Sequence, residues 1–260
     1  MSHEQKLRGF EREIESWKIR IKDANDRKTY DEVFDRQTLL AIYKLFSDGF
    51  FDILDFPIST GKEGNVFRGI TRAGDYVAVK IYRLSTSTFR DLGKYILGDP
   101  RFKKAAKRFP QIIFSWAQKE YSNLERFSKA GVRVPEPIAV HRNVLVMEYI
   151  GNEYMPAPKM KDVILEDPNA TAEYLLESVK NAYSRGHIVH GDMSEYNVLM
   201  TEDAPVIIDL AQAVVLDHWM SQELLERDIT NLARFFRKAG VMIDEKEQLG
   251  RIRGGETATS

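Results

Sequence analysis

The pattern of hydrophobic and polar positions predicts a small β-sheet followed by a long helix. Three short runs rich in β-branched and aromatic residues lie near 50–58, 64–70 and 76–82, and glycines separate them. Such runs are typical of strands, and their close succession predicts an antiparallel sheet. Residues 111–131 have apolar residues at helical spacing and end in a glycine, which is a common helix terminator.

The remainder of the chain is predicted to be mainly helical. Two further strands are expected in 132–150, and prolines at 156 and 158 then indicate a linker. A long amphipathic helix follows at 170–186. The predicted organisation is a helical extension, a sheet lobe with an insertion, a helical lobe and a disordered tail, at 1–50, 51–150 (insertion 83–110), 151–250 and 251–260.

Composition excludes several classes of chemistry. The 260 residues contain no cysteine, so disulfides, thiolate catalysis and Cys-ligated metals are excluded. The five histidines form no HExxH pair, and the net charge of −1 gives no overall attraction to nucleic acid. No apolar run is long enough to span a membrane, and the charged N-terminal segment does not resemble a signal peptide. We therefore expect a cytoplasmic protein.

A glycine-containing loop lies between the first two predicted strands. In residues 59–67, STGKEGNVF, alignment on Val66 places Ser59, Gly61 and Gly64 at the three glycine positions of the protein-kinase loop GxGxxGxV. Backbone amides of such a loop approach phosphate closely, and Lys62 is a further candidate contact. Taken alone, the same residues also suit an ordinary hairpin turn.

Lys80 closes the third predicted strand in the sequence VAVK. It lies 14 residues after Val66, which is where protein kinases place the lysine that holds the α- and β-phosphates of ATP. The alternative is a lysine at a strand end that extends its ammonium into water.

The strongest motif is H-x-D-x4-N, in which His190, Asp192 and Asn197 occur in order. Asp209 ends a short hydrophobic run 12 residues later, where kinases have a metal-binding aspartate. Phosphoryl transfer requires a carboxylate near the acceptor, oxygen ligands for Mg²⁺ and a cation on the phosphates. Asp192, Asn197 and Asp209, together with the preceding lysine of VAVK, supply this set in the expected order. His190 is interpreted as a packed residue that braces the loop rather than as a base.

Five supporting positions are weaker on sequence alone. Glu120 and Glu125 both lie on the long helix and differ by five residues, so only one of them can face a strand lysine. The backbone of Glu148 and Ile150, between the predicted lobes, suits adenine binding, although a plain linker would look the same. Asp228, within a predicted helix, is expected to lie below the catalytic loop and brace it, the alternative being a surface acid.

At these residues the chain resembles the Rio family of atypical protein kinases, in its Rio-one branch. The matching strings span roughly residues 56–237, and they are STGKEGNVF, VAVKIYR, WAQKEYSNLER, VPEPIAV, VLVMEYIG, HGDMSEYNVL and IDLAQAV. The family typically has alanine where this chain has Gly64. The long tails of eukaryotic relatives are absent from the sequence, which favours a compact archaeal-type member.

The resemblance implies a two-lobed, protein-kinase-like α+β fold and a set of residue roles. It makes Asp192 the catalytic aspartate, assigns Mg²⁺ or Mn²⁺ to Asn197 and Asp209, and pairs Lys80 with Glu120. It also implies ATP as substrate, backbone contacts from residues 148 and 150 to adenine, and an aspartyl-phosphate on Asp209 in an ATPase cycle.

The same resemblance implies partners and regulation. Family members act in maturation of the small ribosomal subunit, so precursor protein or rRNA is the expected partner. They autophosphorylate on serine in the insertion, where Ser85 and Ser87 are the serines of this chain. The basic run 101–108 suits RNA contact and equally suits a solvated surface.

One alternative enzyme class remains open from the motif. HGDxxxxN, with Gly191 in place of the usual arginine, also occurs in aminoglycoside and choline kinases. Those enzymes carry their substrate pocket in extra C-terminal helices, and 51 residues follow Asp209 here. A small-molecule kinase is therefore the alternative function. Sequence gives no oligomeric state.

Overall fold

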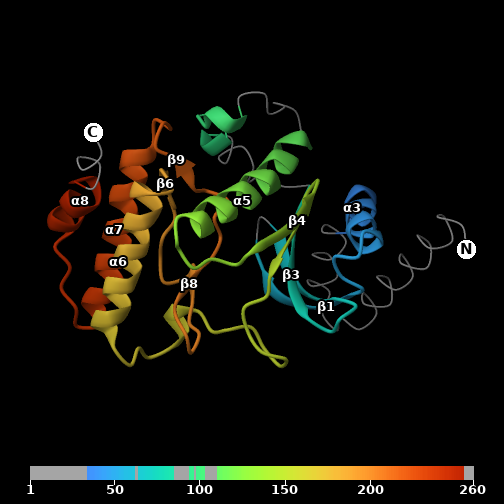
Figure 1. Ribbon diagram of the computed structural model, residues 1–260, viewed down its shortest axis with the longest axis horizontal. Coiled ribbons are helices and arrows are strands. Elements are labelled where there is room, and N and C mark those ends of the chain that lie inside the picture. The colour runs from blue at the N-terminus through green and yellow to red at the C-terminus, as the bar shows by residue number, and fades with distance from the viewer. Residues whose placement is uncertain (1–33, 62–63, 85–93, 97, 103–109, 255–260) are drawn as a thin grey trace, which may run out of the picture. The chain divides into compact units, whose positions relative to one another are not determined.

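A computed structural model describes residues 34–254 except 62–63, 85–93, 97 and 103–109 (Figure 1). The predicted N-terminal helix before residue 33, Lys62, Ser85, Ser87 and most of the basic run therefore lie outside the described residues. The chain divides into two compact units. Of the described residues, the first unit holds 34–84, 110–118 and 138–148, and the second holds 94–102, 119–137 and 149–254.

The first unit contains the predicted sheet. Its five strands are arranged in the order β1-β2-β3-β5-β4. The strand bounds are β1 Ile53–Thr60, β2 Gly64–Ile70, β3 Tyr76–Tyr82, β4 Pro137–His141 and β5 Val144–Glu148. The pairs β1–β2, β2–β3 and β3–β5 are antiparallel, which confirms the prediction from the hydrophobic pattern.

One face of the sheet forms the core of this unit against helix α3, Arg36–Ser47. Alternate residues of β3 point to this face, and Val77, Val79 and Ile81 are all buried. The side chain of Asp35 caps the helix by accepting hydrogen bonds from the backbone of residues 37 and 38. Because the odd positions of β3 face the helix, Ala78 and Lys80 lie on the opposite face of the sheet.

A buried polar link joins α3 to the sheet. Asn143, in the turn between β4 and β5, is fully buried. Its side-chain nitrogen donates to Thr38 Oγ1 and to the Tyr82 carbonyl, each at 2.8 Å. Thr38 Oγ1 in turn donates to the Asp35 carboxylate at 2.9 Å. Helix cap, helix and strand turn are therefore connected by one chain of hydrogen bonds.

Replacing Asn143 should destabilise this unit measurably. In Asn143→Ala the buried Tyr82 carbonyl loses its side-chain donor, so we expect the free energy of unfolding to fall by about 2 kcal/mol. Lys44→Ala, which removes an exposed ion pair with Asp48 on the same helix, should change it by less than about 0.5 kcal/mol. Urea denaturation of both variants measures the difference, and equal effects would contradict the buried link.

The second unit is mainly helical, as predicted. Its helices are α6 Pro168–Ser184, α7 Ser221–Lys238 and α8 Glu245–Arg253, together with the second part of α5, Gln111–Lys129. Two 3-10 turns lie at η1 Pro100–Phe102 and η2 Met160–Asp162. Two short antiparallel ribbons complete the unit: β6 Ile188–Val189 with β9 Val214–Val215, and β7 Val198–Leu199 with β8 Val206–Ile207. Helix α8 continues to Arg253, past the position where we predicted the tail to begin.

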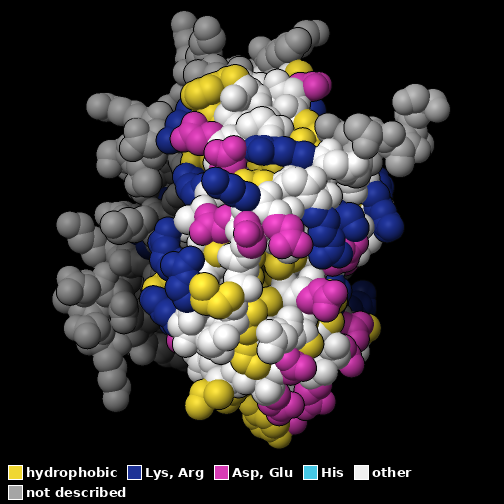
Figure 2. Space-filling model, turned by 90° about the vertical axis from the view of Figure 1, so that its left-hand side faces the viewer, with side chains coloured by type: hydrophobic (Ala, Val, Ile, Leu, Met, Phe, Trp, Pro, Cys, Tyr) yellow, Lys and Arg dark blue, Asp and Glu magenta, His cyan; other side chains and the backbone are white. Residues whose placement is uncertain are grey.

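Helices α6, α7 and α8 lie side by side and present a face of mixed charge (Figure 2). Arg251 of α8 pairs with Glu177 of α6 at 3.0 Å, and Arg253 pairs with Glu226 of α7 at 2.8 Å. The C-terminal end of α8 is thereby tied to both neighbours by exposed pairs, each of which contributes little on its own. No described helix is both long and apolar enough to cross a lipid bilayer.

Candidate active site

The two ribbons of the second unit bring the HxDxxxxN loop and the segment around Asp209 together. Residues 190–197 connect β6 to β7, and residues 208–213 connect β8 to β9. Because β6 pairs with β9 and β7 pairs with β8, both ends of the first loop are held beside both ends of the second. Figure 1 shows β6 and β9 next to each other.

Asn197 connects the three acidic and amide positions that the motif predicted. Its side-chain nitrogen donates to the Asp192 carbonyl at 2.8 Å and to Asp192 Oδ2 at 3.2 Å. Its backbone carbonyl accepts the N–H of Ile208 at 2.9 Å, immediately before Asp209. Both side-chain bonds use the amide nitrogen, so the amide oxygen of Asn197 is the atom left to face a cation.

The carboxyl group of Asp192 has a raised pKa. Burial is the largest cause that raises the pKa of Asp192, and the nearby negative charge of Asp209 raises it further. Arg227 and the Asn197 hydrogen bond act in the opposite direction. A carboxylate with a raised pKa is a better proton acceptor, which suits Asp192 for the predicted role.

Asp209 has a backbone conformation that is rare for a residue with a side chain. Its φ is +63°, in the left-handed region, where aspartate is tolerated better than most residues. Such a conformation costs free energy and persists where the surroundings hold it in place. The local fold therefore constrains the direction of this carboxylate rather than leaving it to a flexible loop.

His190 is a packed residue that joins the two loops, which confirms the prediction. Its Nδ1 accepts the N–H of Asp192 at 3.2 Å, and its Nε2 therefore donates to the Ile208 carbonyl at 3.1 Å. The ring of Phe127 lies edge-on to it at 6.2 Å between centroids. Burial lowers the pKa of His190 to about 4, so the ring is neutral near neutral pH.

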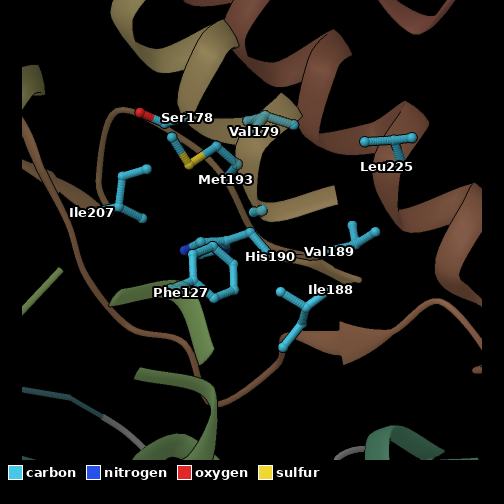
Figure 3. A pocket seen from close by; sticks show the side chains of 10 residues that line it. Phe127, Ser178, Val179, Ile188, Val189, His190, Met193, Ile207 and Leu225 are labelled. Atoms are coloured by element: carbon cyan, nitrogen blue, oxygen red, sulfur yellow. The ribbon is translucent and has the colours of Figure 1, made fainter. Parts of the chain in front are cut away.

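A small pocket lies on the side of His190 that faces the helices (Figure 3). Apart from His190 and Ser178 it is lined by apolar side chains, among them Phe127, Val179, Met193 and Leu225. Neither Asp192 nor Asp209 lines it, so this pocket belongs to the packing behind the loop and not to the predicted site.

Helix α7 braces the catalytic loop from below, as predicted for Asp228. This aspartate is fully buried, and its carboxylate accepts the N–H groups of Gly191 and Met193, each at 2.8 Å. Arg227 donates to the Gly191 carbonyl, and Asn231 donates to the Met193 carbonyl at 3.1 Å. Burial raises the pKa of Asp228 to about 7 against the lowering effect of both N–H donors.

Gly191 has a structural reason to be glycine. Its φ is +78°, and a Cβ atom there would lie 3.3 Å from Leu224 of α7. The arginine that is usual at this place in protein kinases would be strained in this conformation. The departure noted in the sequence therefore matches the close approach of α7.

In the first unit, strand register aligns three of the predicted nucleotide-binding residues. Ser59 of β1 pairs with Val66 of β2, and Val66 pairs with Lys80 of β3. Directly paired residues lie on the same face of a sheet, so these side chains form one row on the face opposite α3. The Lys80 ammonium also lies 5.2 Å from the centre of the Tyr82 ring.

The glycine loop is closed by a hydrogen bond from the Gly61 N–H to the Gly64 carbonyl at 2.9 Å. A Cβ atom on Gly64 would lie 2.3 Å from the Ile81 carbonyl oxygen. Strands β2 and β3 therefore approach each other here too closely for the alanine that is typical of the family.

The structure gives the positions of the remaining predicted residues, but it does not test the contacts that were predicted for them. Glu120 is buried on α5, and Glu125 is half-buried on the same helix. Glu148 ends β5 opposite Val77. The carbonyl of Ile150 accepts the Ala157 N–H at 2.9 Å. The pairing of Lys80 with Glu120 stays a prediction.

Comparisons with known proteins agree with these motifs. A model of the RIO domain matches residues 65–249. The RIO-type serine/threonine-protein kinase Rio1 of Haloferax volcanii is 44% identical over 234 residues, which cover 90% of this chain and 80% of that protein. Rio1 of Methanocaldococcus jannaschii is 40% identical, with 89% and 79% covered. This chain belongs to the RIO family of serine/threonine-protein kinases.

Other relatives match over a smaller share of their own length. The human serine/threonine-protein kinase RIO1 is 37% identical, but the match covers 42% of that protein against 89% of this chain. A crystal structure of the Chaetomium thermophilum Rio2 kinase in an ADP/Mg²⁺-phosphoaspartate complex has a TM-score of 0.62 at 23% identity, covering 81% of this chain and 64% of that one. It confirms the kinase-like fold. The family is one of protein kinases, which decides against the aminoglycoside and choline kinases.

Several residues that hold these two loops were not predicted from the sequence. Arg227 and Asn231 bond carbonyls of the HxDxxxxN loop, and Lys119 and Asn123 of α5 bond carbonyls that follow Asp209. For two of them, the sequence contains one indication of such a role. Lys119 and Asn123 occupy positions in the buried stripe of α5 beside Trp116 and Phe127, where a polar residue requires a partner.

The buried state of His190 predicts a dependence of stability on pH. Its pKa is about 4 in the folded protein and about 6.5 when unfolded, so the unfolded chain binds the extra proton between these values. Folding should therefore lose about 3 kcal/mol from this group as the pH falls from 6.5 to 4.

The test compares urea denaturation of the wild type and His190→Gln across that pH range. The variant should be less stable at pH 7, yet its stability should fall less on acidification. His141 and His218 also have lowered pKa values and remain in both proteins, so they cancel in the comparison. Parallel pH profiles would show that His190 is not the group responsible.

Proposed function

We propose that this chain transfers the γ-phosphoryl group of ATP to a serine hydroxyl, with Mg²⁺ or Mn²⁺ as the metal. The observation that carries the proposal is the connected set Asp192, Asn197 and Asp209, in which one amide bonds the first aspartate and its backbone bonds the residue before the second. This is the order and chemistry that phosphoryl transfer requires.

In the proposed reaction the serine oxygen attacks the γ-phosphorus. The bond between that phosphorus and the bridging oxygen of ADP breaks, and ADP leaves. The proton of the hydroxyl goes to Asp192, whose pKa is raised by burial and by Asp209. His190 and Asp228 keep the loop in place and exchange no proton with the substrate.

The residues present fit a divalent cation. Mg²⁺ prefers oxygen ligands and usually takes one or two protein side chains together with substrate phosphates and water. The Asn197 amide oxygen and the Asp209 carboxylate supply such ligands. Phosphate oxygens of the nucleotide and water would complete the coordination. Within the described residues, no group of three or more His, Cys or acidic side chains could hold a metal ion by itself. The bound metal would neutralise charge that develops on the phosphoryl oxygens.

The nucleotide-binding roles are carried over from the family resemblance. Lys80 is assigned to the α- and β-phosphates, and the loop with Gly61 and Gly64 is assigned to close approach of its amides to phosphate. The N–H of Ile150 is assigned to adenine, since the carbonyl of the same residue is already bonded within the chain.

We also propose an aspartyl-phosphate on Asp209. An oxygen of its carboxylate would attack the γ-phosphorus, ADP would leave, and water would later release phosphate and restore the carboxylate. The support is the Chaetomium thermophilum Rio2 structure, which is an ADP/Mg²⁺-phosphoaspartate complex of a protein with the same fold. A role in maturation of the small ribosomal subunit, with precursor protein or rRNA as partner, is proposed from the family resemblance alone.

Asp192→Ala tests the catalytic assignment. Loss of a positioned base should lower phosphoryl transfer from γ-labelled ATP to protein by at least roughly 100-fold. Glu195→Gln, an acid in the same loop whose side chain lies outside the hydrogen-bonded set, should retain near wild-type transfer. Unchanged transfer in a folded Asp192→Ala protein would refute the assignment.

Chemical stability of the label separates the two proposed acceptors. An acyl phosphate is cleaved by neutral hydroxylamine, whereas phosphoserine is not. We expect a hydroxylamine-sensitive fraction in the wild type that persists in the double variant Ser85→Ala, Ser87→Ala and is absent from Asp209→Asn. Label that resists hydroxylamine in full would exclude the aspartyl-phosphate and leave the serine kinase.

A further inference from the structure

Two polar side chains of α5 hold the segment that follows Asp209. Lys119 and Asn123 lie one helical turn apart and are both fully buried. Asn123 Nδ2 donates to the Leu210 carbonyl at 2.7 Å and to the Ala213 carbonyl at 3.0 Å. Lys119 Nζ donates to the Ala211 carbonyl at 2.9 Å and also to Ala213.

These bonds constrain Asp209 directly. Leu210 is the next residue along the chain, and Asp209 itself has the rare φ of +63°. Three of the carbonyls that follow it are bound by side chains from one helix face. The backbone on the C-terminal side of Asp209 is thus anchored, which restricts the positions that its carboxylate can take.

The other end of Asn123 reaches the predicted insertion. Its Oδ1 accepts a hydrogen bond from Arg101 Nη2 at 2.8 Å. Arg101 makes a two-point ion pair with Asp99, at 2.6 Å from Nη2 and 2.9 Å from Nε. Asp99 is fully buried, and the Arg101 N–H caps the same carboxylate at 3.0 Å. The first residue of the basic run is therefore engaged inside the unit.

A second contact fixes this part of the insertion. The backbone carbonyl of Lys94 lies 3.2 Å from His218 Nε2, a residue that follows β9. Gly98 packs against the same ring so closely that a Cβ atom would lie 2.2 Å from Nε2. The described part of the insertion within 94–102 is therefore attached to both ends of the 210–218 segment.

We propose that Asn123 is a positioning residue for Asp209. Arg101 of the insertion sets the orientation of the Asn123 side chain. In this arrangement a substitution in the insertion alters metal binding, although the substituted residue does not contact the metal. The proposal rests on the proposed function, because it takes Asp209 as a ligand of Mg²⁺.

The expected effect is on the metal dependence. Residues that orient a metal ligand typically change metal affinity or activity by about 10–100-fold when they are replaced. Asn123→Leu removes all three side-chain hydrogen bonds and keeps the same branching and number of heavy atoms. We expect the Mg²⁺ concentration for half-maximal phosphoryl transfer to rise by about 10–100-fold, while the KM for ATP at saturating Mg²⁺ stays within about twofold.

Arg101→Met tests the link to the insertion. It removes the hydrogen bond to Asn123 and the ion pair with buried Asp99, but leaves both hydrogen bonds that the Asn123 amide donates in place. We expect a smaller rise in half-saturating Mg²⁺, about twofold to tenfold, which corresponds to one hydrogen bond. Combined with Asn123→Leu, the rise should be smaller than the product of the two single effects, because the hydrogen bond to Asn123 is already absent and only the loss of the Asp99 ion pair remains. Effects that multiply would overturn the role of Arg101.

The control variant is Gln118→Leu, which removes an exposed amide from the same helix. It should leave the Mg²⁺ dependence unchanged. A merely structural role of Asn123 would lower the amount of active protein and hence kcat, but would leave half-saturation unchanged, and that result would overturn the proposal. Should Asn123→Leu fail to fold, Asn123→Ser is the second variant. Its side chain is too short to form these hydrogen bonds and disturbs the packing less. The same outcomes support or overturn the proposal.

Failure of the proposed function is distinguishable from failure of this inference. If the wild type transfers no phosphate, the proposed function fails. Calorimetric binding of ADP at increasing Mg²⁺ then replaces transfer as the readout for the same variants. If the wild type is active and the folded Asn123 variants match it in Mg²⁺ dependence, only the inference fails.

Discussion

The structure depends on keeping two carboxylates, Asp192 and Asp209, near each other in a partly buried site. Burial raises the pKa of Asp192, and the negative charge of Asp209 raises it further. Left to itself, such a pair would separate or take up a proton. The surrounding chain must therefore fix both backbone segments against this repulsion.

The two segments are fixed in similar ways, by side chains that bond backbone groups. Asp228 and Asn231 of α7 hold the segment that carries Asp192, and Asn123 with Lys119 of α5 hold the segment that carries Asp209. His190 connects the two segments through one backbone group of each. Bonds to backbone position a loop without requiring a particular side chain at each loop residue.

Much of this could be predicted from the sequence, and the exceptions have a physical reason. Strands, long helices and the ordered residues Asp192, Asn197 and Asp209 follow from periodicity and spacing, and so does a bracing role for Asp228. Lys119 and Asn123 were missed because their partners are backbone carbonyls 87–94 residues away, and a carbonyl has the same chemistry in every residue. The positive φ of Asp209 likewise could not be predicted from the sequence, in which the one indication is that the residue is an aspartate.

A lysine suits position 119 because its ammonium group donates hydrogen bonds to backbone carbonyls. The carbonyls of Ala211 and Ala213 are buried with it, and a hydrophobic residue would leave them without this donor. Burial lowers the pKa of Lys119 to about 7, and the negative charge of Asp99 acts against this lowering. The buried ion pair of Asp99 with Arg101 is thus part of the same electrostatic system. Removing Asp99 would favour loss of the proton that Lys119 donates to the turn after Asp209, so the insertion acts on that turn through charge as well as through Asn123.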